Sequence, residues 1–183
     1  MRILLLTHAF NSLTQRLGAD LQQRGHEISI EFDIADSVAE EAVALFRPDL
    51  IVAPYLRRAI PDSIWKRHVC LIVHPGIVGD RGPSALDWAI QAGETEWGVT
   101  VLQAEAEMDA GPVWASAVFP LRAAKKSSIY RNEVTQAACQ AVLQAVERFA
   151  GGYVPTPLAA CTDTRGRLRP LMKQADRAID WQH

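Results

Sequence analysis

The sequence predicts an α/β domain built on a Rossmann-like, mostly parallel sheet flanked by helices. Short apolar runs alternate with amphipathic stretches along most of the chain, and the apolar runs end in turn-forming residues. The composition of the 183 residues, 49% hydrophobic and 22% charged, is that of a globular domain. In such a sheet the ligand sites lie at the carboxyl ends of the strands, so the residues that follow each strand are the first candidates for function.

The first two strand and helix units follow from periodicity and capping. Residues 1–6 form a continuous apolar run, typical of a strand buried on both faces. Alternating polarity over residues 28–32 predicts the second strand. Leucines at four-residue steps with a terminating glycine predict the first helix, and a capping box predicts the second: Leu13, Leu17, Leu21 and Gly25, then Ser37 and Glu40.

The middle of the chain predicts two further buried strands. Residues 50–53 and 69–73 are short apolar runs, and the second run leads directly into His74. Residues 75–83 are rich in glycine and proline and must form a loop before the next helix. The exit of this strand is therefore the most informative point of the sequence.

The last predicted elements are two strands and a long helix. Strands over 98–102 and 113–121 are separated by an acidic loop, which predicts a hairpin-like excursion or an antiparallel edge. An amphipathic helix over 128–150 follows. We therefore expect a catalytic domain over 1–152 and an extended C-terminal segment over 153–183.

Charge and cysteine content exclude several classes of function. Nineteen Lys and Arg against 21 Asp and Glu give a net charge of -2, which argues against a general nucleic-acid surface. The three cysteines, Cys70, Cys139 and Cys161, lack metal-ligand spacing and are interpreted as buried thiols in a reducing compartment. The first apolar run is too short for a signal peptide, and no run is long enough to span a membrane. We expect a cytoplasmic protein without a metal.

Two residues near the predicted strand ends are candidates for catalysis. His74 can donate to an oxyanion or transfer a proton near neutral pH, although a histidine bonded to a loop carbonyl is an equally good interpretation. Asp109 can orient an imidazole or accept a proton through water. On spacing alone, its Asp-Ala-Gly segment is more often an ordinary turn.

Four other residues are candidates for binding. Asn11 and Ser12 precede a helix and can hold a phosphate or carboxylate at its N-terminus, but ordinary capping explains them equally well. Arg57 and Arg58 follow the third strand and can meet an anionic substrate, although solvated arginines are the default. Neither Walker A nor GxGxxG spacing occurs, so a dinucleotide site lacks its fingerprint.

Four ordered motifs resemble the formyl-tetrahydrofolate-dependent formyltransferases. The family's Asn-x-His-Pro-Ser strand exit and later Arg-Gly resemble residues 72–76 and 81–82. Its Gly-Val-Thr strand and Asp-x-Gly-Pro turn resemble residues 98–100 and 109–112. The resemblance covers most of the chain and implies the formyltransferase fold.

The resemblance also implies roles for particular residues. His74 and Asp109 take the positions of the family's catalytic His and Asp, and formyl-tetrahydrofolate is the implied formyl donor. The pterin would contact the loop after the third strand and the backbone of the acidic loop, at Leu56, Arg57, Arg58, Ala59 and Glu107. Independently of the resemblance, we expect Asn11 and Ser12 to hold an acceptor phosphate. Ile72 replaces the family's Asn, and an isoleucine cannot donate to the oxyanion.

Residues 74–90 and the tail from Arg167 to Trp181 are similar to the HypX (HoxX) family of hydrogenase maturation proteins. That similarity implies coenzyme A as the formyl acceptor. It also implies a second, enoyl-CoA-hydratase-like domain that releases carbon monoxide for nickel-iron hydrogenase, with the hydrogenase maturation machinery as partner. Two alternatives stay open. One is a folate- or coenzyme A-binding domain without independent catalysis, because Ile72 removes a donor, and the other is a formyl-tetrahydrofolate hydrolase, with water as acceptor.

Overall fold

The computed structural model describes residues 1–162 and 164–177. Strands and helices alternate up to the fifth strand, as the periodicity predicts. In chain order the elements are β1 (Arg2–Thr7), α1 (Ser12–Gln23), β2 (Glu27–Phe32), α2 (Asp36–Phe46), β3 (Leu50–Tyr55), α3 (Asp62–Trp65), β4 (Cys70–His74), α4 (Ala85–Gln91), β5 (Glu96–Gln103), β6 (Val113–Pro120), α5 (Lys126–Ile129), the π-helix η1 (Tyr130–Val134), α6 (Thr135–Ala150), and the 3-10 helices η2 (Leu158–Ala160) and η3 (Gln174–Arg177).

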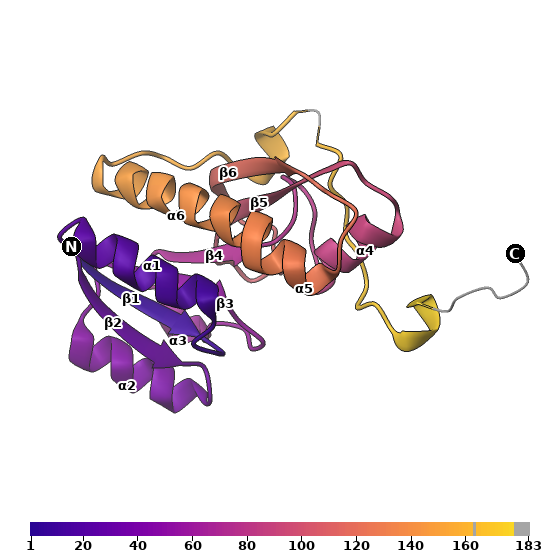
Figure 1. Ribbon diagram of the computed structural model, residues 1–183. Coiled ribbons are helices and arrows are strands. Elements are labelled where there is room, and N and C mark those ends of the chain that lie inside the picture. Colours follow the sequence, from indigo (N-terminus) through magenta and orange to yellow (C-terminus); the bar gives the residue numbers. More distant parts are fainter. Residues whose placement is uncertain (163, 178–183) are drawn as a thin grey trace, which may run out of the picture.

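The six strands form one sheet in the order β2-β1-β3-β4-β5-β6 (Figure 1). Strands β2, β1, β3 and β4 are parallel to one another, whereas β5 runs antiparallel to both β4 and β6. The predicted mostly parallel, Rossmann-like sheet is therefore confirmed. The hairpin of β5 and β6 forms its antiparallel edge.

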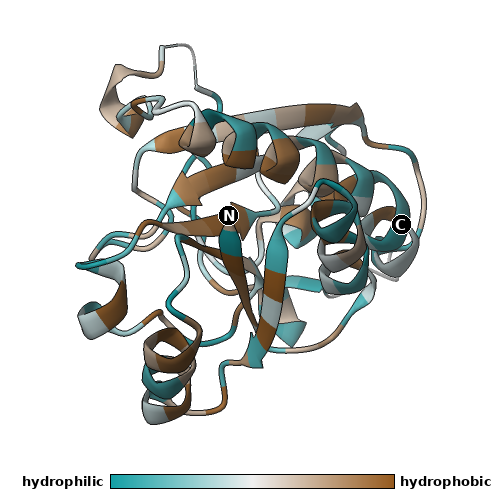
Figure 2. Ribbon diagram, turned by 90° about the vertical axis from the view of Figure 1, so that its left-hand side faces the viewer, coloured by the Kyte–Doolittle hydropathy of each residue, from teal (hydrophilic) through white to brown (hydrophobic). Residues whose placement is uncertain are grey.

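Helices cover both faces of the sheet because the strands are apolar on both. Neighbouring residues of a strand point to opposite faces, so Leu5 packs with α1 and α6 while Leu4 packs against α2 and α3. Figure 2 shows the result: the strands inside are largely hydrophobic, and the helices carry hydrophilic residues on their outer sides. Both faces of the sheet are therefore covered.

Two helices differ in detail from the sequence prediction. The predicted capping box of Ser37 and Glu40 is wrong: α2 begins at Asp36, its cap Ala35 makes no side-chain bond, and Glu40 accepts from the Ser63 hydroxyl instead. The long helix after β6 is continuous from 126 to 150 but contains a π-helical turn.

The C-terminal segment turns back toward the glycine-rich loop and α4 (Figure 1). The Met172 N–H donates to the Ser84 hydroxyl at 3.1 Å, and the Trp88 indole donates to the Pro170 carbonyl at 2.8 Å. The end of the tail resemblance, up to Trp181, lies outside the described residues.

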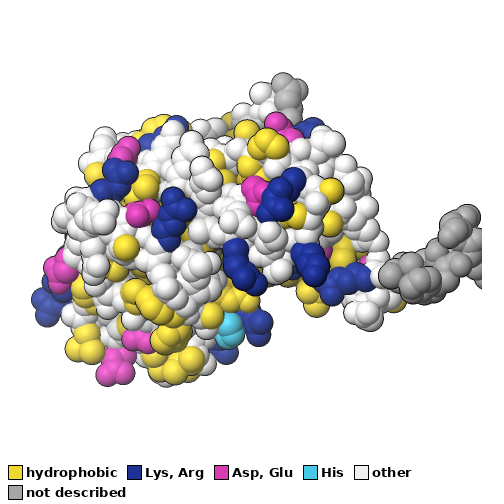
Figure 3. Space-filling model, in the orientation of Figure 1, with side chains coloured by type: hydrophobic (Ala, Val, Ile, Leu, Met, Phe, Trp, Pro, Cys, Tyr) yellow, Lys and Arg dark blue, Asp and Glu magenta, His cyan; other side chains and the backbone are white. Residues whose placement is uncertain are grey.

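Charged side chains of both signs are mixed on the molecular surface. Figure 3 shows acidic and basic side chains interspersed over one face, with a short row of Lys and Arg across its middle. Within the described part of the chain, no helix combines the length and apolar character needed to cross a lipid bilayer.

The three cysteines differ in accessibility, so the rate at which each thiol is labelled shows whether the fold is intact. Burial raises the pKa of Cys70 to about 12 and that of Cys139 to about 11. Cys161 is half-exposed, contrary to the expectation of three buried thiols.

A polar maleimide at pH 8 should therefore label Cys161 quickly, and Cys70 and Cys139 only on unfolding, because the thiolate is the reactive form. Peptide mass mapping reads this out, with Cys161→Ser as control; rapid native labelling of Cys70 would contradict the packing.

Candidate active site

His74 is the last residue of β4 and lies where the parallel strands end. Its side chain is only 4% exposed. Two residues of β5 hold the turn that follows it: the Thr100 hydroxyl donates to the Gly76 carbonyl at 2.8 Å, and the Trp97 indole donates to the Pro75 carbonyl at 3.0 Å. The segment after β4 is thus fixed from the neighbouring strand.

Asp109 reaches His74 by an indirect path. Because β5 is antiparallel to β4, the acidic loop starts at the far end of β4, where the Ala104 N–H donates to the Cys70 carbonyl at 2.7 Å. The loop then folds back along β4, and Asp109 Oδ2 ends 3.4 Å from His74 Nδ1. The structure therefore brings together the two residues that the sequence proposed as a pair.

The turn at Asp109 is shaped by its neighbours. Asp109 has a φ of 52°, a left-handed conformation that Asp tolerates better than most residues. Its Oδ2 also accepts the Gly82 N–H at 3.0 Å. A Cβ at Gly111 would overlap the Gln103 carbonyl, so the Asp-Ala-Gly sequence suits this chain reversal. The same carboxylate oxygen thus faces the imidazole and the glycine-rich loop.

A second carboxylate faces the other side of the imidazole. Asp80 is 1% exposed, and its Oδ1 lies 3.4 Å from His74 Nε2. Its Oδ2 accepts from Arg169 Nε at 2.7 Å, across 89 residues of sequence. A neutral imidazole has one N–H and can donate to one carboxylate at a time, whereas the protonated ring donates to both. The site is thus suited to moving a proton.

The predicted pterin-binding loop, 56–59, follows β3 at the same edge of the sheet. Leu56, Arg58 and Ala59 line a small cavity together with residues of α2 and the strand ends. Leu56 is half-buried and Ala59 is exposed. The Arg57 and Arg58 side chains are exposed; Arg57 Nε donates to the Tyr55 hydroxyl at 3.2 Å, and Arg58 pairs with Asp36 at 2.6 Å.

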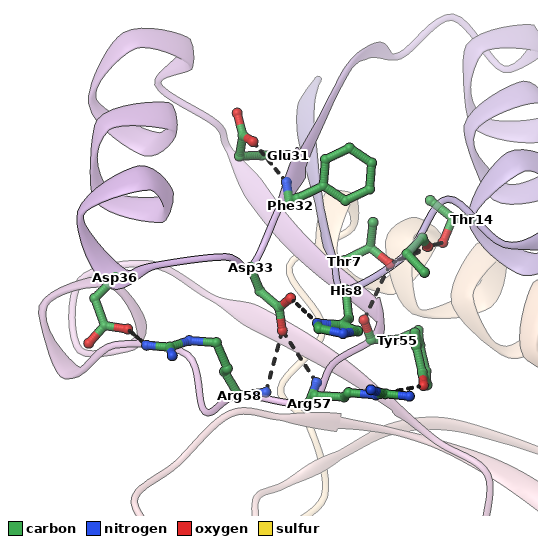
Figure 4. Close-up of polar contacts among 11 residues, drawn as sticks. Thr7, His8, Thr14, Glu31, Phe32, Asp33, Asp36, Tyr55, Arg57 and Arg58 are labelled. Atoms are coloured by element: carbon green, nitrogen blue, oxygen red, sulfur yellow. Dashed lines mark hydrogen bonds and ion pairs between the residues drawn. The ribbon is translucent and has the colours of Figure 1, made fainter.

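Asp33 anchors this loop, as Figure 4 shows. Its carboxylate is 5% exposed and accepts the backbone N–H groups of Arg57 and Arg58 at 3.3 and 3.4 Å. The other oxygen lies 2.7 Å from Nδ1 of His8. One buried carboxylate therefore joins the ends of β1, β2 and β3. Sequence reasoning missed it, although an acid directly after a predicted strand was a usable signal.

The other predicted binding residues are Asn11, Ser12 and Glu107. The Asn11 side-chain oxygen accepts the Thr14 N–H at 3.0 Å and so caps α1, while Ser12 is the exposed first residue of that helix. Glu107 is exposed and forms an ion pair with Arg81. The structure shows the capping role of Asn11 directly, and ligand contacts of these residues stay predictions.

Ile72 lies two residues before His74 on the same strand and so faces the same side of the sheet. It is half-buried and packs against the core beneath α2 and α3. Its side chain has no hydrogen-bond donor, so any stabilisation of an oxyanion at this strand end must come from other groups.

A cavity of about 540 Å³ lies elsewhere, between β6, α6 and the C-terminal segment. The strand-end site is the stronger candidate for chemistry, because paired ionisable groups rather than volume determine where chemistry is possible. Among residues 1–162 and 164–177, no group of three or more His, Cys, Asp or Glu is arranged to hold a metal ion.

Comparison with known proteins shows which families this chain is similar to. Residues 19–146 match the family model described as formyl transferase. The hydrogenase maturation factor HoxX of Bradyrhizobium diazoefficiens is 60% identical over the whole chain, which covers 32% of that protein. The chain thus spans about a third of the length of this relative.

Solved structures of formyltransferases and of HypX also resemble this chain. The crystal structure of HypX from Aquifex aeolicus in complex with tetrahydrofolic acid superposes with a TM-score of 0.92 and 51% identity, covering 99% of this chain and 31% of that one. Methionyl-tRNA formyltransferase from Clostridium thermocellum has a TM-score of 0.76 at 17% identity, covering 100% of this chain and 78% of that one. The second comparison shows the shared fold alone, which confirms the predicted formyltransferase fold.

Replacing Asp33 by alanine should loosen the loop after β3. Hydrogen bonds to a buried charged group are worth about 1.5–3 kcal/mol, so we expect Asp33→Ala to lower the free energy of unfolding by about that amount or more. The matched control is Asp36→Ala, which removes an exposed ion pair and should cost at most about 1 kcal/mol. Urea unfolding measures both, and equal losses would contradict the anchoring role.

Proposed function

This chain belongs to the formyl transferase family, and we propose that it transfers a formyl group from formyl-tetrahydrofolate to an acceptor. The observation that carries the proposal is the buried pair of His74 and Asp109, 3.4 Å apart at the strand edge. The tetrahydrofolate complex of the related HypX from Aquifex aeolicus supports a folate donor.

The proposed acceptor is coenzyme A. In the proposed reaction, the acceptor sulfur bonds to the formyl carbon, the carbon–nitrogen bond to the folate breaks, and the proton lost from sulfur ends on the folate nitrogen. Asp109 assists removal of the proton from sulfur, and His74 stabilises or protonates the tetrahedral intermediate. The two residues can act on the same proton because their side chains contact each other.

We further propose that the product supplies carbon monoxide for nickel-iron hydrogenase maturation. The name of the HoxX relative, a hydrogenase maturation factor, and its greater length support this. In this proposal residues 1–152 are the formyltransferase-like catalytic domain, and 153–183 lead toward an enoyl-CoA-hydratase-like domain. The hydrogenase maturation machinery is the proposed partner. The free thiols of Cys70, Cys139 and Cys161 suit the reducing cytoplasm as its compartment.

The loop 56–59 and the backbone at Glu107 are the proposed pterin contacts. The position of this loop after β3, at the same edge of the sheet as His74, supports this placement, and Asp33 holds the loop through its backbone N–H groups. Asn11 and Ser12 are proposed to contact the acceptor. Because Asn11 already caps α1, its amide nitrogen is the group proposed for that contact.

Ile72 favours a second candidate function, a folate- or coenzyme A-binding domain without independent catalysis. Loss of one oxyanion donor typically costs about 2.7–4 kcal/mol of transition-state stabilisation. A domain that lacks this donor can bind its ligands and still depend on other groups for turnover. Hydrolysis of formyl-tetrahydrofolate, with water as acceptor, requires the same His74 and Asp109.

One assay separates these functions. The full chain is incubated with formyl-tetrahydrofolate, with and without coenzyme A, and the products are identified by mass spectrometry. Formyl-coenzyme A supports the transferase, and formate that forms without coenzyme A supports the hydrolase. Folate binding without any product supports the binding domain, and absence of both binding and product contradicts all three.

Substitution of the pair tests its catalytic role. We expect His74→Ala and Asp109→Asn each to lower kcat about 10²- to 10⁴-fold, the usual contribution of a positioned acid or base. His26→Ala and Asp20→Asn replace the same residue types away from the strand-end site and should leave kcat near the parent value. Stopped assays of formyl transfer measure this; parent-like turnover in both pair variants would contradict the assignment.

A further inference from the structure

The C-terminal segment runs along the glycine-rich loop next to His74. The Arg81 N–H donates to the Arg167 carbonyl at 3.1 Å, and the Arg169 N–H donates to the Arg81 carbonyl at 2.8 Å. These bonds give a parallel bridge between Arg81 and Leu168. Backbone hydrogen bonds thus dock residues 167–169 on the loop that carries Asp80.

This approach is so close that two glycines are required. Gly82 has a φ of 110°, and a Cβ on it would overlap the Arg169 carbonyl. A Cβ on Gly166 would overlap the backbone of Gly79 and Asp80. The loop and the C-terminal segment are therefore matched to each other on both sides of the contact.

The Arg169 side chain points inward from this contact. It is 7% exposed, although Arg167 and Leu168 beside it are exposed. Its Nε donates to Asp80 Oδ2 at 2.7 Å, and its guanidinium lies 5.5 Å from the centre of the Trp97 ring. An arginine held both by a carboxylate and by an aromatic face has a defined position.

Asp80 transmits that position to the imidazole. One oxygen is bonded to Arg169 at 2.7 Å, and the other lies 3.4 Å from His74 Nε2. The two oxygens thus divide the carboxylate between the arginine and the imidazole, and the contact with the arginine is the shorter one. Without Arg169, the buried carboxylate would have the imidazole as its remaining cationic partner among these groups.

We propose that Arg169 is a positioning residue for formyl transfer, acting through Asp80 on His74, and that the C-terminal segment is part of the active site. Asp80 lies inside the stretch 19–146 that matches the family model, whereas Arg169 lies outside it. The inference rests on the proposed formyl transfer for its activity readout.

The test compares Arg169→Gln with Arg165→Gln in the full chain. Arg165 belongs to the same segment but is exposed and pairs with Glu96, so it is the matched control. We expect Arg169→Gln to lower kcat per folate-binding site about 10²-fold, because small misplacement of a catalytic group has effects of this size. The KM for the folate should change less than about threefold, whereas a merely structural role would lower the folded fraction and leave kcat per site unchanged.

Two further variants keep the test decisive if Arg169→Gln folds poorly. The double variant Asp80→Asn, Arg169→Gln removes both charges and should recover at least about tenfold over Arg169→Gln, since no charged carboxylate then holds His74. Arg169→Lys keeps the charge but loses the Nε contact. Its kcat should therefore lie between that of the parent and that of Arg169→Gln. Parent-like kcat in Arg169→Gln or Arg169→Lys, or no recovery in the double variant, overturns the proposal.

A measurement without substrate separates this inference from the proposed function. Imidazole ¹⁵N spectra of His74 should shift in Arg169→Gln, return toward the parent in Arg169→Lys, and stay unchanged in Arg165→Gln. An unchanged His74 resonance in Arg169→Gln overturns the positioning role. If the parent chain transfers no formyl group, the proposed function fails, and the spectra still decide whether Arg169 positions His74.

Discussion

The imidazole of His74 lies between two carboxylates, and the arrangement of the site depends on that interaction. Asp109 faces Nδ1 and Asp80 faces Nε2, each at 3.4 Å. The ring is buried, so its two nitrogens face these carboxylates and not solvent. Leaving a buried carboxylate without a partner is costly, and the Gly82 N–H and the Arg169 guanidinium meet that need for Asp109 and Asp80.

Topology explains how residues far apart in the sequence come together around this ring. β4 is the last parallel strand of the sheet, and its end presents His74 to the same edge as the loop after β3. Because β5 is antiparallel to β4, the acidic loop starts at the end of β4 opposite His74. The loop then folds back and places Asp109 beside the His74 ring. The C-terminal segment then closes the far side. The loop 56–59, where we propose that the formyl donor binds, follows β3 at this same edge of the sheet.

Much of the fold could be predicted from the sequence because apolar periodicity reports burial directly. His74 and Asp109 could be proposed because each lies in a recognisable motif. Asp80 and Arg169 could not, since 89 residues separate them and Arg169 alternates with Arg165 and Arg167 in a run that resembles a solvated segment. Only the contact geometry distinguishes the one buried arginine from its two exposed neighbours. The capping box failed for a related reason: Glu40 has a tertiary partner, Ser63, that local pattern cannot reveal.

The most direct test of this account is to follow the imidazole ¹⁵N resonances of the full chain during titration with tetrahydrofolate. The account predicts a saturable shift of the His74 resonances, with His26 and His68 unchanged, because the folate would lie beside His74 at the strand edge. Absence of folate binding, or binding that shifts other histidines and leaves His74 unchanged, would contradict the placement of formyl transfer at this site.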